Sequence, residues 1–203
     1  MKLLSFKSTS ALALALIAGG VMTTTVSAAP VTKNSNGKIE YRQGKIDIVD
    51  PDHPNDPMHP AVPSFDFGTQ DITTDNKTYN AVTAGTLTVS DLRGTGAGWN
   101  VTVTQQAQLK TAANDELTGA VLKLTNATTS NSYNETVNFT AADLTPGTAS
   151  RVFDAPVNNG NGTSRLKFAD ASSDAQLEVP GSTVKKAAAY TAILEWTLTD
   201  SPA

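Results

Sequence analysis

The chain has 203 residues, no cysteine and a formal net charge of −4. This length suits one domain of ordinary size plus a leader. The absence of cysteine excludes a disulfide framework, a thiolate metal site and a cysteine nucleophile. The negative charge argues against nucleic acid as a ligand, since proteins bind nucleic acid through lysine and arginine, and against simple charge attraction to any polyanion.

The first 28 residues have the organisation of a secretory signal peptide. Lys2 and Lys7 form a positive start, residues 11–22 form an apolar stretch, and residues 26–28 are a small-residue cleavage site. The apolar stretch is shorter than the ~20 residues of a membrane span, so we expect cleavage rather than a retained anchor. The sequence predicts an exported protein whose mature chain begins near Ala29 and has no transmembrane segment.

Residues 29–63 are expected to form a mobile arm followed by a connector rich in proline and aspartate. The arm is polar and contains at most one short strand, around Lys38 to Tyr41. Residues 50–63 contain five prolines. Because each proline fixes φ and lacks a backbone donor, this connector should be extended, like a strap.

The connector also contains both histidines, His53 and His59, close to Asp50, Asp52 and Asp56. Imidazole and carboxylate groups suit divalent ions. The spacing of the two histidines fits no common zinc motif, so we expect a solvated strap and no metal site. Calcium binding by the acidic connector is left open.

Residues 64–203 have the pattern of an all-β domain. Short runs that are apolar at every second position alternate with Gly, Asn, Asp, Thr and Ser, as in half-buried strands. We expect a single β-sandwich or an open-barrel-like domain, with turns at residues 93–98, 145–147 and 158–162. Helices fit only at residues 107–117 or 182–189. The predicted strands contain Phe65/Phe67, Leu87/Val89, Trp99/Val101/Val103, Ala120/Leu122/Leu124, Val137/Phe139, Leu166/Phe168, Leu177/Val179 and Tyr190 to Leu198.

No enzyme template is recognisable in this domain. A histidine base would have to act from the flexible connector, and no pair of carboxylates stands out for glycoside hydrolysis. The run of Gly94, Gly96 and Gly98 lacks the lysine of a phosphate loop and opens a strand rather than a helix. We therefore expect a tight turn there, no cofactor and no catalysis.

The two tryptophans lie in similar alternating segments. Trp99 shares a strand face with Val101, and Trp196 shares one with Leu198. One interpretation has both indoles stacking on sugar rings, and the other places both in the core. Alternation favours the core, since the face of Trp196 is the apolar one.

With these motifs in place, the chain resembles the WxL-domain surface proteins of Gram-positive bacteria. The resemblance rests on the signal peptide, the connector, residues 65–68, the first motif in residues 98–103 and the second in residues 190–200. The first motif has Val101 where the family has leucine, a conservative change on a buried face. The motif positions are Trp99, Val101, Trp196 and Leu198.

The resemblance implies a secreted protein held on the cell wall by non-covalent association with peptidoglycan. It also implies a membrane-anchored WxL-interacting protein as a partner. An alternative function is a structural subunit or adhesin that binds such a partner or host matrix and touches the wall only indirectly. An enzyme acting on wall glycan is a more distant alternative.

Overall fold

The computed structural model describes residues 29–50 and 62–201. The chain divides into two units, Met1–Glu40 and Tyr41–Ala203. The described residues of the first unit, 29–40, form no helix or strand and are exposed, so the short strand expected around Lys38 is not formed. Most of the proline-rich connector, including both histidines, lies outside the described residues.

The second unit confirms the all-β prediction. No residue that the structure describes is helical, including residues 107–117 and 182–189. The twelve strands are β1 (Ile46–Ile48), β2 (Lys77–Asn80), β3 (Thr86–Asp91), β4 (Trp99–Gln105), β5 (Val121–Leu124), β6 (Thr128–Asn131), β7 (Asn138–Phe139), β8 (Ala142–Leu144), β9 (Ala149–Ala155), β10 (Gly162–Lys167), β11 (Ala175–Val179) and β12 (Leu194–Thr199).

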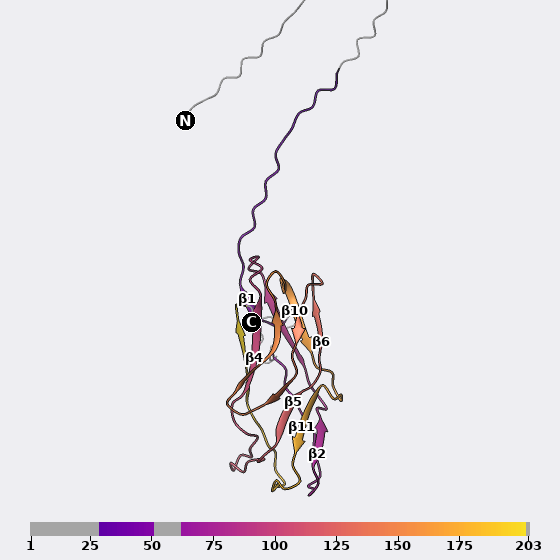
Figure 1. The fold of residues 1–203 in the computed structure, drawn as a ribbon, viewed down its shortest axis with the longest axis vertical. Coiled ribbons are helices and arrows are strands. Elements are labelled where there is room, and N and C mark those ends of the chain that lie inside the picture. The colour runs from indigo at the N-terminus through magenta and orange to yellow at the C-terminus, as the bar shows by residue number, and fades with distance from the viewer. Residues whose placement is uncertain (1–28, 51–61, 202–203) are drawn as a thin grey trace, which may run out of the picture. The chain divides into compact units, whose positions relative to one another are not determined.

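These strands form three antiparallel sheets of four strands each. The β3 sheet has the order β1-β3-β10-β6, the β4 sheet has the order β12-β4-β9-β7, and the β5 sheet has the order β2-β11-β5-β8. In Figure 1, β4 and β10 lie towards one end of this unit and β5 and β11 towards the other. The β5 sheet thus continues the unit beyond the ends of the other two sheets.

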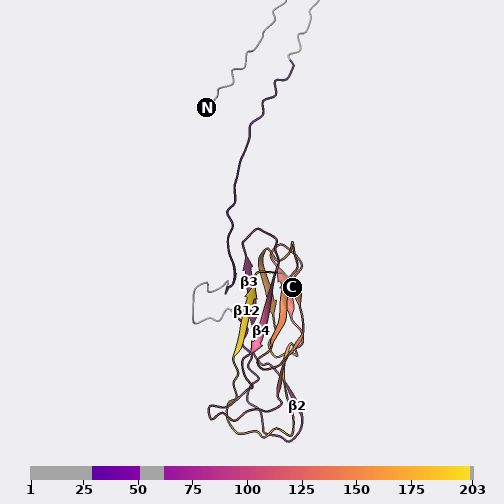
Figure 2. The same ribbon diagram turned by 60° about the vertical axis from the view of Figure 1, so that its left-hand side comes forward.

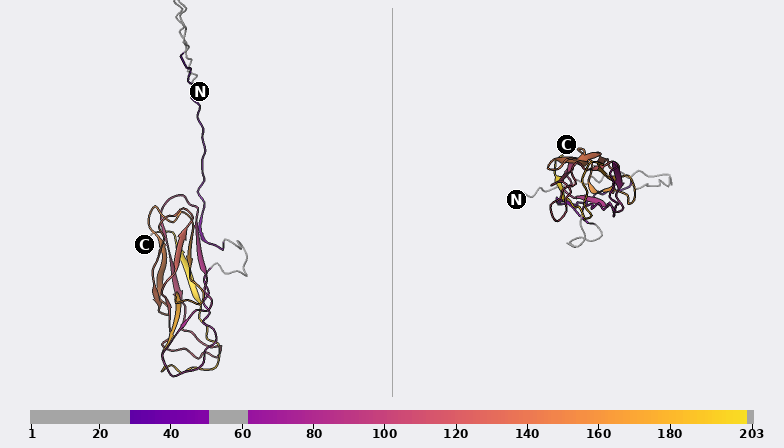
Figure 3. Two further views of the ribbon diagram at one scale, coloured as in Figure 1. Left: turned by 90° about the vertical axis from the view of Figure 1, so that its right-hand side faces the viewer. Right: turned by 90° about the horizontal axis from the view of Figure 1, so that it is seen from below.

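Alternating side chains from all three sheets build one core. Every second residue of β4 is fully buried, from Trp99 through Val101 and Val103. These side chains belong to the same hydrophobic cluster as the inward residues of β3, β9, β10 and β11. The Phe139 ring of β7 meets the Phe168 ring beyond β10 edge to face at 5.9 Å, which joins the β4 sheet to the β3 sheet. In the right-hand view of Figure 3, which looks along the long axis, the strands of the second unit are arranged around a common axis.

One of the strands predicted in residues 64–203 is absent. Residues around Phe65 and Phe67 do not form a ladder, and Asp66 makes only an isolated bridge with Thr83. The Phe65 ring is nevertheless packed against Phe168 at 5.2 Å, edge to face. Gly68 follows with a φ of 70°, which turns the chain out of the extended direction. The alternation therefore identified a packed segment, but no neighbouring strand extends the pairing.

The predicted turns are confirmed by their backbone angles. Gly98, at the entrance to β4, has a φ of 75°, and a Cβ there would lie 2.6 Å from the carbonyl oxygen of Ala155. Only glycine fits such a position without strain. The turns at residues 145–147 and 158–162 likewise contain residues with positive φ, Gly147, Asn158, Gly160 and Gly162.

Candidate functional site

The two tryptophan motifs are neighbours in space. β12 pairs with β4 in an antiparallel register that places Leu198 opposite Val101 and Trp196 opposite Val103. Figure 2 shows the two strands side by side. The third positions of the two motifs are therefore direct cross-strand partners, although the motifs lie far apart in the sequence. Their side chains share the inward face of the β4 sheet.

Trp99 of the first motif is fully buried, and its indole nitrogen is hydrogen-bonded. Its ring packs on Phe153 at a centroid distance of 4.9 Å, and its Nε1 donates to the Gly160 carbonyl at 3.1 Å. Gly160 has a φ of 78°, and a Cβ on this residue would lie 2.5 Å from the indole nitrogen. The turn at residues 158–162 therefore closes directly over the first motif.

Arg93 links the ends of both motifs. Its guanidinium makes two hydrogen bonds with the Asp91 carboxylate, at 3.0 and 2.8 Å, and donates to the carbonyl of Gly98 at 2.9 Å. It also donates to the carbonyl of Asp200 at 3.0 Å. Gly98 directly precedes the first motif, and Asp200 follows the second. One side chain thus fixes the start of β4 and the end of β12.

The ion pair between Arg93 and Asp91 is almost completely buried, with side-chain exposures of 9% and 1%. Burial acts to raise the pKa of the Asp91 carboxyl, but the hydrogen bonds and charge of Arg93 outweigh it, so this pKa lies below its usual value. The hydrogen bond with Asp91 raises the pKa of Arg93 against the effect of burial. Asp91 therefore remains charged at neutral pH.

Trp196 of the second motif is in a different environment. It is half-buried on β12, which is the edge strand of its sheet. Its Nε1 is buried and has no hydrogen-bond partner among the residues that the structure describes. Leu198 is also half-buried and packs against the core cluster. The second motif therefore borders on solvent, whereas the first does not.

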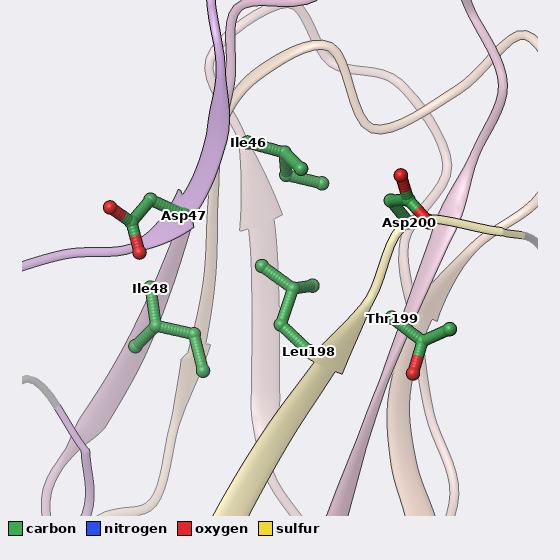
Figure 4. Close-up of a pocket in the computed structure, with 6 residues that line it drawn as sticks. All are labelled: Ile46, Asp47, Ile48, Leu198, Thr199 and Asp200. Carbon is green, nitrogen blue, oxygen red and sulfur yellow. The ribbon is translucent and has the colours of Figure 1, made fainter.

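A cleft of about 410 Å³ lies beside the end of the second motif. It separates β12 from β1, the edge strand of the β3 sheet, and is lined by Ile46, Asp47, Ile48, Leu198, Thr199 and Asp200. Figure 4 shows the side chains of Ile46 and Leu198 pointing into the space between the two strands, while Asp47 and Thr199 point away from it. The cleft therefore has an apolar interior and a polar rim.

The opposite, outward face of the β4 sheet is polar. Across β4 and β12, Asn100 pairs with Thr199, Thr102 with Thr197 and Thr104 with Glu195. β9 continues this face, and its Arg151 pairs with Thr102. The middle residue of each motif, Asn100 or Thr197, lies on this face. We call this set of residues the outer face of the β4 sheet.

Sequence reasoning located the motif residues but missed Asp91, Arg93 and Gly160. The signal for the ion pair was a charged residue on each side of Leu92 at the end of an apolar strand, just before the glycine turn. The cleft was also missed, because it depends on how β1 and β12 end in three dimensions.

Two findings concern only the part of the chain that the structure describes. There, no group of three or more metal-binding side chains comes together. His53 and His59 lie outside that part, so the structure does not test their role. Within the same residues, no helix is long and apolar enough to cross a membrane.

The fold and the paired motifs define an all-β surface domain with two tryptophan strands side by side. The family described as "WxL domain surface cell wall-binding" matches residues 28–202, and the chain belongs to this family. The match covers every strand and both motifs, and it indicates a role in binding the cell wall at the cell surface. The family is one of binding domains and not of enzymes. No curated protein and no solved structure matches the chain.

Proposed function

We propose that the domain binds peptidoglycan directly and without covalent attachment, through the outer face of the β4 sheet. The observation that carries this proposal is the composition of that face. It presents hydroxyl and amide groups from two adjacent strands, with Asn100 and Thr102 on β4 and Thr197 on β12. Cell-wall binding itself follows from the family, and the polymer and the surface are the proposed part.

The position of the tryptophans supports hydrogen bonding over stacking as the binding mode. Trp99 is fully buried, and Trp196 shares the inward face of the sheet. Neither indole lies on the outer face. Along a strand, side chains on one face repeat at about 6.8 Å, and neighbouring strands lie about 4.8 Å apart. Such a regular polar array suits a polymer of repeating sugar units.

Charge supports peptidoglycan over an anionic polymer as the ligand. The whole chain is acidic, with a formal net charge of −4, so it has no general attraction to teichoic acid. The outer face carries charges of both signs, with Arg151 close to Asp154. Binding through neutral hydroxyl and amide groups should depend only weakly on salt.

The test is co-sedimentation of the mature protein, residues 29–203, with peptidoglycan stripped of teichoic acid. The double variant Thr102→Val/Thr197→Val removes two hydroxyls while keeping the shape of the side chains. The matched control is Thr163→Val, which changes a half-buried threonine on β10 in the β3 sheet. We expect saturable binding by the wild type and the control, and clearly weaker binding by the double variant. A folded wild type that stays in the supernatant would disprove direct binding.

A second candidate is a subunit or adhesin that a membrane-anchored WxL-interacting protein holds at the wall. The observation that favours it is the pair of open strand edges at the cleft between β1 and β12. Both candidates presuppose export through the predicted leader, residues 1–28. Release of a mature chain starting near Ala29, measured by mass spectrometry of the secreted protein, tests that step.

A further inference from the structure

No strand of the described residues pairs with the outer edge of β1, which presents backbone groups to the cleft. Leu92 donates to the Lys45 carbonyl at 3.0 Å, and Val49 donates to the Thr88 carbonyl at 2.9 Å. In an antiparallel pair, residues alternate between bonding to the neighbour and pointing away from it. Ile46 and Ile48, which lie between the bonded positions, therefore direct their N–H and C=O groups away from β3.

On the other side of the cleft, the outer edge of β12 also presents backbone groups to it. Gln106 donates to the Ile193 carbonyl at 2.9 Å, which makes Ile193 a bonded position. By the same alternation, the backbone groups of Trp196 and Leu198 point away from β4. The two tryptophan-motif residues thus contribute their side chains to the core and their backbone groups to the open edge. Unpaired edges of this kind are templates for a further strand.

The cleft between these edges has the properties of a slot for one strand. Its volume is about 410 Å³, and the side chains of Ile46 and Leu198 point into it (Figure 4). The carboxylates of Asp47 and Asp200 lie at its borders. An inserted strand would bond with its backbone on both sides, bury alternate apolar side chains and favour basic residues on its outer face.

Residues 38–42 of this chain have that pattern. Ile39 and Tyr41 are two positions apart and are 74% and 86% exposed, which is unusual for large apolar side chains. They alternate with Lys38, Glu40 and Arg42, which carry a net positive charge. The segment is therefore strand-like in sequence, although it is not paired in the structure.

A tight hairpin that pairs this segment with β1 of the same chain would break a hydrogen bond next to β1. The backbone N–H of Gly44 donates to the Leu92 carbonyl at 2.8 Å, so the chain still runs along β3 at this residue. A two-residue turn at Gln43 and Gly44 would leave that N–H unbonded. This cost favours an occupant from another molecule.

We propose that residues 38–42 of a second copy insert between β1 and β12, with Ile39 and Tyr41 inward and Lys38 and Arg42 near Asp47 and Asp200. This contact joins two different surfaces of the same protein. Repetition of such a contact produces an open chain of copies, unless two molecules exchange arms and close a dimer. The inference does not depend on the wall polymer or on wall binding.

The first test is sedimentation velocity of the mature protein over a range of concentrations. The wild type should associate as its concentration rises. Ile39→Asp/Tyr41→Asp should remain monomeric, because it places charges at both inward positions. Val31→Asp is the matched control, since Val31 is 82% exposed in the same arm but outside the segment, and it should associate like the wild type. A wild type that is monomeric throughout, or association that survives in the double variant, overturns the proposal.

The second test examines the slot with a labelled peptide of residues 36–44, titrated with the Ile39→Asp/Tyr41→Asp protein and followed by fluorescence anisotropy. Ile48→Pro removes an outward donor of β1, and we expect it to weaken peptide binding by about tenfold or more. Thr129→Pro is the control on β6, at the far edge of the same sheet, and should bind normally.

Asp200→Lys keeps the test informative if Ile48→Pro does not fold. The Asp200 side chain is exposed, and the hydrogen bond from Arg93 goes to its backbone carbonyl, so the carboxylate acts on Arg93 through its charge and not through a hydrogen bond. Reversing its charge should weaken peptide binding severalfold, and more strongly at low salt. Equal binding by the wild-type peptide and a peptide with aspartate at positions 39 and 41 would place the binding outside the slot and overturn the proposal.

Discussion

The two tryptophan motifs have similar sequences but different surroundings. The first lies on β4, inside its sheet, where Trp99 is fully buried and its nitrogen is bonded to Gly160. The second lies on the edge strand β12, where Trp196 is half-buried and its nitrogen has no partner. Both motifs direct their tryptophan side chains inward. The position of the strand within the sheet decides what each motif contributes to the structure. The first motif mainly stabilises the core, and the second also leaves an open edge.

Truncating each tryptophan should give the largest contrast. Trp99→Ala removes a fully buried ring and should lower the free energy of unfolding by about 3–5 kcal/mol. Trp196→Ala removes a half-buried ring without breaking a hydrogen bond and should cost about 1–2 kcal/mol. Urea unfolding followed by circular dichroism measures both. Equal losses would mean that the two motifs are energetically equivalent, contrary to their burial.

Arg93→Met tests the link between the motifs. It leaves the Asp91 carboxylate buried without its partner, and such a change typically costs about 3–5 kcal/mol. The variant should also free the Asp200 carbonyl, so hydrogen exchange should increase more at the end of β12 than within β4. Exchange that increases equally in both strands would show that Arg93 does not hold the edge strand selectively.

Gly160→Ala tests the cover over the first motif. The added Cβ would lie 2.5 Å from Trp99 Nε1, at a residue with a φ of 78°. We expect the strained backbone and the overlap together to lower the free energy of unfolding by about 2–4 kcal/mol. Gly147→Ala is the matched control, because Gly147 has the same φ of 78° but nothing within 4 Å of the added atom. Gly147→Ala should lower the free energy of unfolding by about 1 kcal/mol. Thermal unfolding of the two variants measures the difference.

Replacing each tryptophan by phenylalanine isolates the contribution of the indole N–H group to stability. Trp99→Phe removes the donor to the Gly160 carbonyl and should cost about 1–2 kcal/mol beyond the change in ring size. Trp196→Phe removes a buried donor that has no partner, so its loss should be smaller by about 1 kcal/mol or more. If chemical denaturation gave the opposite order, Trp196 would have a hydrogen-bond partner in solution.

The smallest expected effect is the pH dependence of stability that comes from the Asp91 carboxylate. The pKa of Asp91 is lowered in the folded state, so its stabilising effect is complete above its unfolded pKa of about 3.9 and is lost as the pH falls through the folded pKa. Stability should therefore hardly change between pH 7 and pH 5 on account of this group. Asp91→Asn should flatten the decline below pH 4, as measured by unfolding at a series of pH values.

The sequence predicted most of the central strands but only some of the edge strands, among them β7 and β12. β3, β4, β5, β10 and β11 have clear alternation because their inward side chains enter the core. The missed strands β2, β6 and β8 are sheet edges, where polar residues such as those of Thr128–Asn131 are tolerated. β9 was missed for another reason. A bulge opposite Val101 and Thr102 leaves the adjacent Val152 and Phe153 both buried, which breaks the period of two.

The candidate site was predicted only in part. The four motif positions came from the sequence and the family resemblance, but their pairing did not, since alternation gives a face and not a neighbour. Arg93 illustrates the limit, because its bonds to Gly98 and Asp200 join segments from opposite ends of the domain. No local pattern encodes a contact of that range. Cleft and outer face likewise depend on the register between β4 and β12.

The pairing of β4 with β12 also has a consequence for folding order. β12 is the last strand of the chain, yet it covers one side of β4, which is synthesised much earlier. During synthesis, the β4 sheet therefore lacks this outer strand until the segment Leu194–Thr199 has been made. Long-range pairing of this kind slows folding and leaves apolar side chains accessible in the meantime. Until residue 199 has been synthesised, the domain therefore cannot complete its fold.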